Sequence, residues 1–184
     1  MSGNDGTMHR AFIALGSNIE PERNLPLAVE RLSSLGRIDA VSSVYESPPA
    51  DGSSQPDYLN AAVLLSTRWS VQRLCREALP AIETDLGRVR DPADRYAPRT
   101  IDLDLVLYDE VILAVDHRRI PDPDIPERAF LAIPLAELCR DYVVPAAACT
   151  LEQLAAPHRA AGLLTPRPDV VLGRKETPAA DGPD

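Results

Sequence analysis

The 184-residue chain has few cysteines, few aromatic residues and no long apolar run. Its three cysteines, Cys75, Cys139 and Cys149, lie far apart and form no CxxC or CxxH grouping, which argues against a disulfide framework. Residues 1–10 contain no apolar signal segment, and no run approaches the roughly eighteen apolar residues that a membrane span requires. We therefore expect a cytoplasmic protein with no membrane partner.

Positive charge is also scarce. The chain has 19 Lys and Arg against 28 Asp and Glu, a net charge of −9, so it offers no broad basic surface to nucleic acid. A length of 184 residues and an apolar content of 45% favour one compact domain with a substantial core. We expect a monomer with a single domain over residues 1–173 and a disordered polar tail over residues 174–184.

Against this acidic background, four arginines fall within twelve residues: Arg88, Arg90, Arg95 and Arg99. Guanidinium groups match the oxygen geometry of phosphate, so this cluster indicates a local anion. The alternative is a solvated loop in which the arginines pair with Asp91 and Asp94.

Directly after this cluster, residues 100–107 are β-branched or aliphatic except for Asp102 and Asp104. The period of two in a β-strand places both carboxylates on one face. Two neighbouring acids on a half-buried strand repel each other unless a cation neutralises them, and oxygen ligands without nearby His or Cys favour Mg²⁺ over Zn²⁺. With the arginines, they favour a metal-bound polyphosphate, although the acids of an ordinary strand could simply face solvent.

Hydrophobic periodicity predicts an alternation of strands and helices. The expected strands are residues 10–15, 38–46, 58–67 and 100–108, and the expected helices are residues 21–35 and 71–86. Because a proline inside a helix removes a hydrogen bond, we expect a kink near residues 78–80, at Pro80. The β-α-β-β-α-β order is typical of a ferredoxin-like α+β sandwich with helices packed on the sheet.

The remainder of the chain is less regular. Residues 111–115 are interpreted as a hairpin partner of the strand at 100–108, and residues 127–138 as short helical turns interrupted by Pro134. A short helix is expected over residues 151–156. The chain from about Val171 onward is expected to contribute no core residues.

Five separate segments of the chain all resemble motifs of one protein family. They are Ala14 to Asn18; Ser47 to Pro49 with Gln55 to Asn60; Glu83 with Gly87 to Arg90; Arg95-x-x-Pro98-Arg99-x-x-Asp102-x-Asp104; and Arg128 to Phe130. Together they resemble the 6-hydroxymethyl-7,8-dihydropterin pyrophosphokinases of folate biosynthesis over roughly residues 11–138. The resemblance implies transfer of pyrophosphate from ATP to the hydroxymethyl group of a reduced pterin, giving AMP and the pterin diphosphate.

The resemblance also implies roles for individual residues. Asp102 and Asp104 would hold two Mg²⁺ ions and act in catalysis with Arg88 and Arg99. The ATP-binding residues would be Glu83, Arg88, Arg90, Tyr96, Arg99, Ile101 and Arg128. The pterin-binding residues would be Ser47, Pro48, Pro49, Ala50, Tyr58, Asn60 and Phe130. Tyr58 and Phe130 would sandwich the pterin ring, whereas from the residues alone each could equally be ordinary packing.

Several positions depart from the family pattern, among them Tyr96 and Pro80, and the most serious departure is at Asp122. Asp122, in Ile120-Pro121-Asp122-Pro123, stands where the family carries a histidine that is expected to touch the ATP phosphates. A carboxylate there would repel phosphate unless it turned away or bound a cation. Two alternatives therefore stay open: a non-catalytic paralogue that binds pterin or nucleotide, and an unrelated Mg²⁺-dependent nucleotidyl or phosphoryl transferase, for which the chain has no P-loop.

Overall fold

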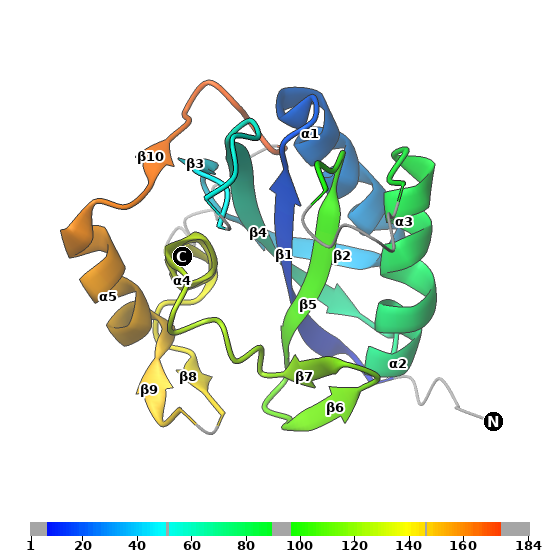
Figure 1. The fold of residues 1–184 in the computed structure, drawn as a ribbon. Helices are drawn as coiled ribbons and strands as arrows, with labels where there is room; N and C mark the ends of the chain where they lie inside the picture. The colour runs from blue at the N-terminus through cyan, green and yellow to red at the C-terminus, as the bar shows by residue number, and fades with distance from the viewer. Residues whose placement is uncertain (1–6, 51, 90–96, 146, 174–184) are drawn as a thin grey trace, which may run out of the picture.

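A computed structural model describes residues 7–50, 52–89, 97–145 and 147–173. Its centre is an antiparallel sheet in the order β10-β3-β4-β1-β5, with β2 also paired to β4 (Figure 1). The strands are β1 (His9–Ser17), β2 (Gly36–Val41), β3 (Tyr45–Ser47), β4 (Tyr58–Thr67), β5 (Asp102–Tyr108) and β10 (Thr165–Pro166). The expected ferredoxin-like α+β fold is thereby confirmed, whereas the tail over residues 174–184 lies outside the described residues.

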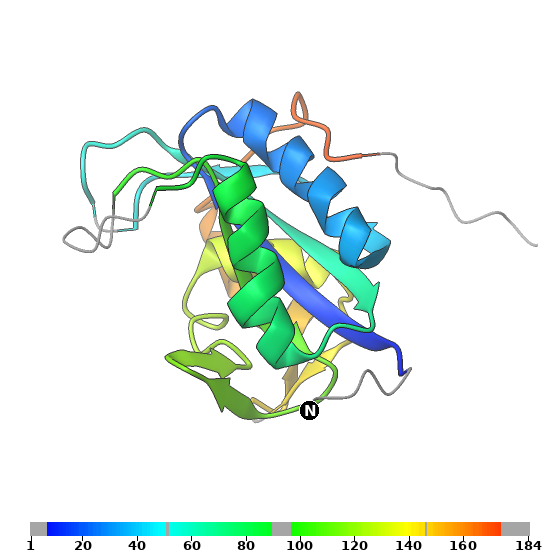
Figure 2. The ribbon, with the colours of Figure 1, turned by 90° about the vertical axis from the view of Figure 1, so that its right-hand side faces the viewer.

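Helices cover both faces of the sheet (Figures 1 and 2). One face carries α1 (Pro21–Leu32) and a longer helix formed by α2 (Val71–Arg73), a π-helical turn η2 (Leu74–Ala78) and α3 (Leu79–Asp85). The other face carries α4 (Ala129–Leu138), and α5 (Leu151–Ala161) packs on α4. In β1, Ile13 and Leu15 pack in the core beneath α1 and α3, whereas Phe12 packs beneath α4. Alternate residues of β1 thus pack into the two hydrophobic cores, one on each face of the sheet. No helix among the described residues is long and apolar enough to cross a bilayer.

The predicted strand over residues 38–46 is wrong in its continuity, because two strands, β2 and β3, replace it. Between them, the Ser42 hydroxyl accepts a hydrogen bond from the Ala62 N–H (2.8 Å), and the Glu137 carboxylate accepts one from the Ser43 N–H (2.6 Å). The Ser42 N–H still donates to the Ala62 carbonyl (3.0 Å), but side chains supply the other partners here, and the strand ends before the chain turns toward Ser47.

The predicted pairing of residues 111–115 with the strand at 100–108 is also wrong. β6 (Leu113–Val115) instead forms a separate two-stranded ribbon with β7 (Arg118–Ile120). A second small ribbon joins β8 (Val143–Val144) to β9 (Cys149–Thr150), and a 3₁₀ turn, η1 (Ser33–Leu35), follows α1. β7 runs close to β5, so the ribbon brings Arg118 to the edge of the sheet that carries Asp104.

Two helical predictions differ from the structure in their extent. Residues 129–138 form one helix with Pro134 inside it, because nearly the whole circumference of α4 is buried between the sheet and α5. The predicted helix over residues 151–156 extends to Ala161 and is capped at its start by the Thr150 hydroxyl. Near Pro80, where a kink was predicted, the structure has the π-helical turn η2, which ends two residues before that proline; the kink itself stays a prediction.

The C-terminal segment contributes to the core, contrary to the expectation from sequence. Val170 and Leu172 are buried, with exposed fractions of 8% and 5%. Arg167 ties this segment down by ion pairs to Glu46 (2.6 Å) on β3 and Glu22 (3.2 Å) on α1. The segment therefore braces the short strand that leads into Ser47.

We expect Leu172→Ala to lower the free energy of unfolding by about 2 kcal/mol, because removal of buried methyl groups leaves a cavity. Val171→Ala is a matched control, since Val171 is 70% exposed and its truncation should change stability by no more than about 0.5 kcal/mol. Urea unfolding of both variants measures the difference. Equal midpoints would show that the segment does not belong to the cooperative core.

Candidate active site

A pocket of about 200 Å³ opens where the ends of β1, β4 and β5 meet the loop after β3 and the start of α4. Its wall contains the two expected acids, Arg99 and all seven expected pterin residues. The lining comprises Ala14, Leu15, Gly16, Ser47, Pro48, Pro49, Ala50, Gln55, Tyr58, Asn60, Arg99, Asp102, Asp104, Phe130 and Leu131. Segments separated by more than one hundred residues thus form one cavity.

The register of the sheet explains why these residues meet. Gly16 on β1 pairs with Asn60 on β4 and with Asp102 on β5, so the three lie in one row across the sheet. A Cβ on Gly16 would meet Asn60 Oδ1 at 3.6 Å and the Tyr58 ring at 3.9 Å. The absence of a side chain on Gly16 therefore leaves space in the pocket wall beside Asn60 and Tyr58.

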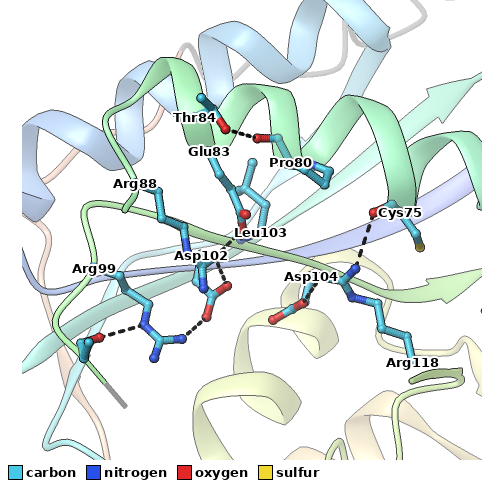
Figure 3. A network of polar contacts seen from close by, with 11 residues as sticks. Cys75, Pro80, Glu83, Thr84, Arg88, Arg99, Asp102, Leu103, Asp104 and Arg118 are labelled. Carbon is cyan, nitrogen blue, oxygen red and sulfur yellow. Dashed lines mark hydrogen bonds and ion pairs between the residues drawn. The ribbon is translucent and has the colours of Figure 1, made fainter. Parts of the chain in front are cut away.

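Asp102 and Asp104 lie on the same face of β5, as predicted from their spacing (Figure 3). The Asp102 carboxylate accepts hydrogen bonds from Arg88 Nη1 and from Arg99 Nη1, the latter at 2.5 Å. Burial alone would raise the pKa of Asp102, but these two guanidinium groups outweigh it and hold the pKa below its ordinary value. Asp102 is therefore a fixed negative charge.

Asp104 has a different electrostatic environment. Burial and the negative charge of Asp102 raise its pKa to about 6, against the opposing effect of Arg118, whose Nη2 donates to Asp104 Oδ1 at 3.2 Å. The Asp104 side chain is still 44% exposed and lies in the pocket wall. Two adjacent acids with pKa values shifted in opposite directions are typical of a functional site.

Carboxylate oxygens are the ligands that Mg²⁺ prefers, and Asp102 and Asp104 fit that ion. Among the described residues, no third His, Cys, Asp or Glu joins them to form a complete metal cage. Mg²⁺ commonly keeps several waters and substrate phosphates in its coordination shell. The pair is thus suited to an ion that arrives with phosphate.

Beneath the carboxylates, Glu83 on α3 is 2% exposed. It accepts a hydrogen bond from the Leu103 N–H at 2.9 Å and forms an ion pair with Arg88, whose side chain is 10% exposed. Figure 3 shows Glu83 pointing from the helix toward Leu103 on β5, with Arg88 beside it. Glu83 therefore holds Arg88 and β5 in place, and it does not line the pocket.

The aromatic and amide groups expected to bind pterin line the pocket from different elements. Tyr58 and Asn60 come from β4, and Phe130 comes from the first turn of α4. Asn60 Nδ2 donates to Ser47 Oγ at 2.9 Å, which links the amide to the loop over residues 47–50. The arrangement offers aromatic surface and a hydrogen-bonding edge to a flat heterocycle.

Not every predicted ATP-binding residue lies at the pocket. Ile101 is fully buried in the core, so a direct contact of its side chain with ATP is blocked in this conformation. Arg128 precedes α4 and lies 3.8 Å from the Asp124 carboxylate, with its side chain 44% exposed. Arg90 and Tyr96 fall outside the described residues. The roles of these four residues stay predictions.

The departure at Asp122 has a local explanation. Asp122 Oδ1 accepts a hydrogen bond from the Asp124 N–H at 2.8 Å, and the Asp122 N–H donates to the Val106 carbonyl at 2.9 Å. Asp122 does not line the pocket. Its carboxylate thus serves a turn beside β5, and repulsion of a pocket-bound phosphate is correspondingly reduced.

Two residues without a predicted role join the site. Asn18 is 4% exposed; its amide accepts from the Arg99 N–H (2.8 Å) and donates to Gln55 Oε1 (3.2 Å). It therefore links the arginine loop to the loop before β4. Its position at the end of the motif Ala14 to Asn18 could have indicated from the sequence that Asn18 belongs to the site. The second residue, Arg118, had no sequence signal, since only the ribbon of β6 and β7 brings it to Asp104.

Comparisons with known proteins agree with this geometry. Residues 12–140 match the family model described as 7,8-dihydro-6-hydroxymethylpterin-pyrophosphokinase. Two similar proteins are each named 2-amino-4-hydroxy-6-hydroxymethyldihydropteridine pyrophosphokinase. The one from Haemophilus influenzae is 40% identical over 141 residues, covering 75% of this chain and 86% of the relative; the one from Bacillus subtilis is 36% identical over 146 residues, covering 78% and 86%.

Solved structures provide a likeness of fold. The crystal structure of wild-type Plasmodium falciparum HPPK-DHPS with pteroate aligns with a TM-score of 0.64 at 12% identity, over 84% of this chain and 43% of that one. The complex of the same protein with SDX-DHP gives 0.65 over 84% and 45%. This chain therefore spans less than half of those longer chains. From the matched family model and the similar proteins, the chain belongs to the 7,8-dihydro-6-hydroxymethylpterin-pyrophosphokinase family.

Proposed function

We propose that this chain transfers the β,γ-pyrophosphoryl group of ATP to the hydroxymethyl oxygen of 6-hydroxymethyl-7,8-dihydropterin, giving AMP and the pterin diphosphate. The observation that carries the proposal is the single pocket in which Asp102, Asp104 and Arg99 face the same space as Tyr58, Asn60 and Phe130. Groups suited to binding phosphate and groups suited to binding a flat heterocycle thus line one pocket, so two substrates bound there could react with each other.

Asp102 and Asp104 are the residues that would hold magnesium, and we propose two ions. Bound there, the ions would neutralise phosphate charge and orient the transferred group. Arg88 and Arg99 both contact Asp102 now, and each carries a guanidinium that can bind phosphate oxygens instead. Their contribution is to position the triphosphate and stabilise its charge as the bond to AMP breaks.

The pterin ring is assigned to the space between Tyr58 and Phe130, with its polar edge toward Asn60 and the loop Ser47 to Ala50. Asn18 and the Asn60–Ser47 hydrogen bond hold the surrounding loops in relation to the sheet. This placement directs the hydroxymethyl group toward the carboxylates of β5, because Asn60, Gly16 and Asp102 form one row. Proximity of this kind supplies much of the rate enhancement in phosphoryl transfer.

The test is AMP formation from ATP and Mg²⁺ by the purified chain, with and without the reduced pterin. Pterin-dependent AMP release supports the proposal and shows that Asp122 is compatible with turnover. A folded chain that binds pterin but releases no AMP would instead be the binding-only paralogue. ADP formation would indicate a different phosphoryl transfer.

Three further features belong to the same proposal. Residues 1–173 are proposed to form one domain, and the protein is proposed to act as a monomer in the cytoplasm. The free thiols of Cys75, Cys139 and Cys149 are consistent with a reducing compartment. Sedimentation measurements and cell fractionation test the last two points.

Phe130→Ala is expected to weaken binding of the reduced pterin by about 10- to 100-fold, because stacking of a flat heterocycle on an aromatic ring contributes about 1–3 kcal/mol. Fluorescence titration of the apo protein with pterin measures the change. Binding of a non-hydrolysable ATP analogue with Mg²⁺ is the control and should stay within about twofold. An unchanged pterin affinity would remove Phe130 from the binding site.

A further inference from the structure

Arg118 lies within the residues that match the family model but outside the five motif segments that carry the resemblance. It lies on β7, and its side chain is 20% exposed. Nη2 donates to Asp104 Oδ1 at 3.2 Å, and Nη1 donates to the Cys75 carbonyl at 3.4 Å (Figure 3). The guanidinium therefore bridges a candidate metal ligand and the backbone of the helix that covers the sheet.

The Cys75 carbonyl is available because of the π-helical turn and Pro80. The Leu79 N–H, which would serve Cys75 in a regular α-helix, donates to the Leu74 carbonyl. The next residue is Pro80, which has no N–H to donate. A buried carbonyl without a hydrogen-bond partner costs free energy, and Arg118 supplies the donor that the helix backbone does not provide to the Cys75 carbonyl. One end of the guanidinium is thus anchored on backbone that no substrate replaces.

Among the described residues, the charges that pair around the start of β5 balance. Three carboxylates, Glu83, Asp102 and Asp104, face three guanidinium groups, Arg88, Arg99 and Arg118. Binding of metal ions alone would leave the site with an excess of positive charge. Binding of a triphosphate alone would leave it with an excess of negative charge. A triphosphate carries about four negative charges, which two magnesium ions offset, so the two ligands together preserve the balance.

Resting on the proposed function, we infer that Arg118 is a nucleotide-binding residue that exchanges one partner for another. Before binding, Nη2 holds the Asp104 carboxylate. When metal occupies that carboxylate, the anchored guanidinium turns Nη2 to an oxygen of the metal-bound triphosphate. The exchange is favourable because phosphate and carboxylate present the same acceptor geometry to a guanidinium.

Arg118→Met tests the exchange by two affinities that should move in opposite directions. Mn²⁺ is the metal probe and α,β-methylene-ATP the nucleotide probe, each titrated into the full chain by calorimetry. Without Arg118, Mn²⁺ alone should bind at least threefold more tightly, because its competitor for Asp104 is gone. The nucleotide with Mn²⁺ should bind at least tenfold more weakly. Arg119→Met is the matched control, since Arg119 is the adjacent, exposed residue of β7, and both of its affinities should stay within twofold.

The outcomes separate the possible roles. A nucleotide affinity within twofold of wild type overturns the inference. Weakening of both affinities would also overturn it, because Arg118 would then only position Asp104. If the Met variant does not fold, Arg118→Lys replaces it, with an intermediate loss of nucleotide affinity expected because an ammonium cannot span both acceptors. If the wild-type chain itself binds no nucleotide, the proposed function fails together with this inference.

Discussion

Asp104→Asn is expected to reduce pterin-dependent AMP formation by about 1,000-fold or more. The substitution keeps the shape of the side chain but removes one of two negative charges that would hold magnesium. Metal ions contribute several kcal/mol to the stabilisation of charge in phosphoryl transfer, and about 4 kcal/mol corresponds to about 1,000-fold in rate. Single-turnover kinetics at saturating Mg²⁺ measure the loss. Turnover within tenfold of wild type would remove Asp104 from the metal site.

The same variant should fold at least as well as wild type in the absence of metal. The folded-state pKa of Asp104 is about 6, above its ordinary 3.8. A raised pKa contributes stability that is fully present below about pH 4 and is lost as the pH rises through about 6. Asparagine has no such pH dependence, so its advantage should emerge across that interval. The side chain is 44% exposed, and solvent screening limits the gain to about 1 kcal/mol or less.

Urea unfolding at pH 4 and pH 8, without divalent cations, checks this second part. The two proteins should differ less at pH 4 than at pH 8, where the Asn variant should be the more stable. A variant that is markedly less stable at pH 8 would mean that the Asp104–Arg118 ion pair stabilises the fold more than burial of the charge costs. The loss of activity could then not be assigned to metal binding alone.

The core strands were predictable because their patterns are strong. β4 is buried along nearly its whole length, and its run of apolar residues coincides with the predicted strand at residues 58–67. The period of two in β5 placed Asp102 and Asp104 on one face, and the pocket contains both. The irregularity predicted near Pro80 coincides with a π-helical turn over the residues before it.

Features that depend on distant partners were not predictable from local pattern. Pro134 indicates a helix break on its own, but burial of α4 against both the sheet and α5 outweighs the lost hydrogen bond. Likewise, Leu172 looks like part of a polar tail until Arg167 ties the segment to Glu22 and Glu46. Tertiary contacts decide both cases.

The candidate site divides in the same way. The resemblance to a family supplied the seven residues that are proposed to bind pterin, and all seven line the pocket. It did not reveal that Glu83 lies beneath the strand or that Ile101 belongs to the core. Arg118 could not be recognised because its relation to Asp104 requires the pairing of β6 with β7. The residue types indicated the chemistry of the site. The contacts of Glu83 and Arg118 with β5 depend on the tertiary structure.

The second large effect is expected from the buried ion pair of Glu83 and Arg88. Arg88→Met should lower the free energy of unfolding by about 3–5 kcal/mol, because Glu83, 2% exposed, would keep a buried charge without its guanidinium. Arg37→Met is the control: the Arg37–Asp39 pair has an arginine that is 79% exposed, and its loss should cost less than about 1 kcal/mol. Chemical unfolding at neutral pH gives both values.

A double variant separates the folding role of Arg88 from its catalytic role. Glu83→Gln in the Arg88→Met background removes the buried negative charge, while the amide oxygen can still accept the Leu103 N–H that Glu83 accepts at 2.9 Å. Stability should therefore return for the most part. Turnover should stay low, because no guanidinium remains at position 88 to contact the triphosphate. Recovery of stability together with activity would make Arg88 purely structural, and failure to recover stability would show that the cost lay in lost packing, not in the buried charge.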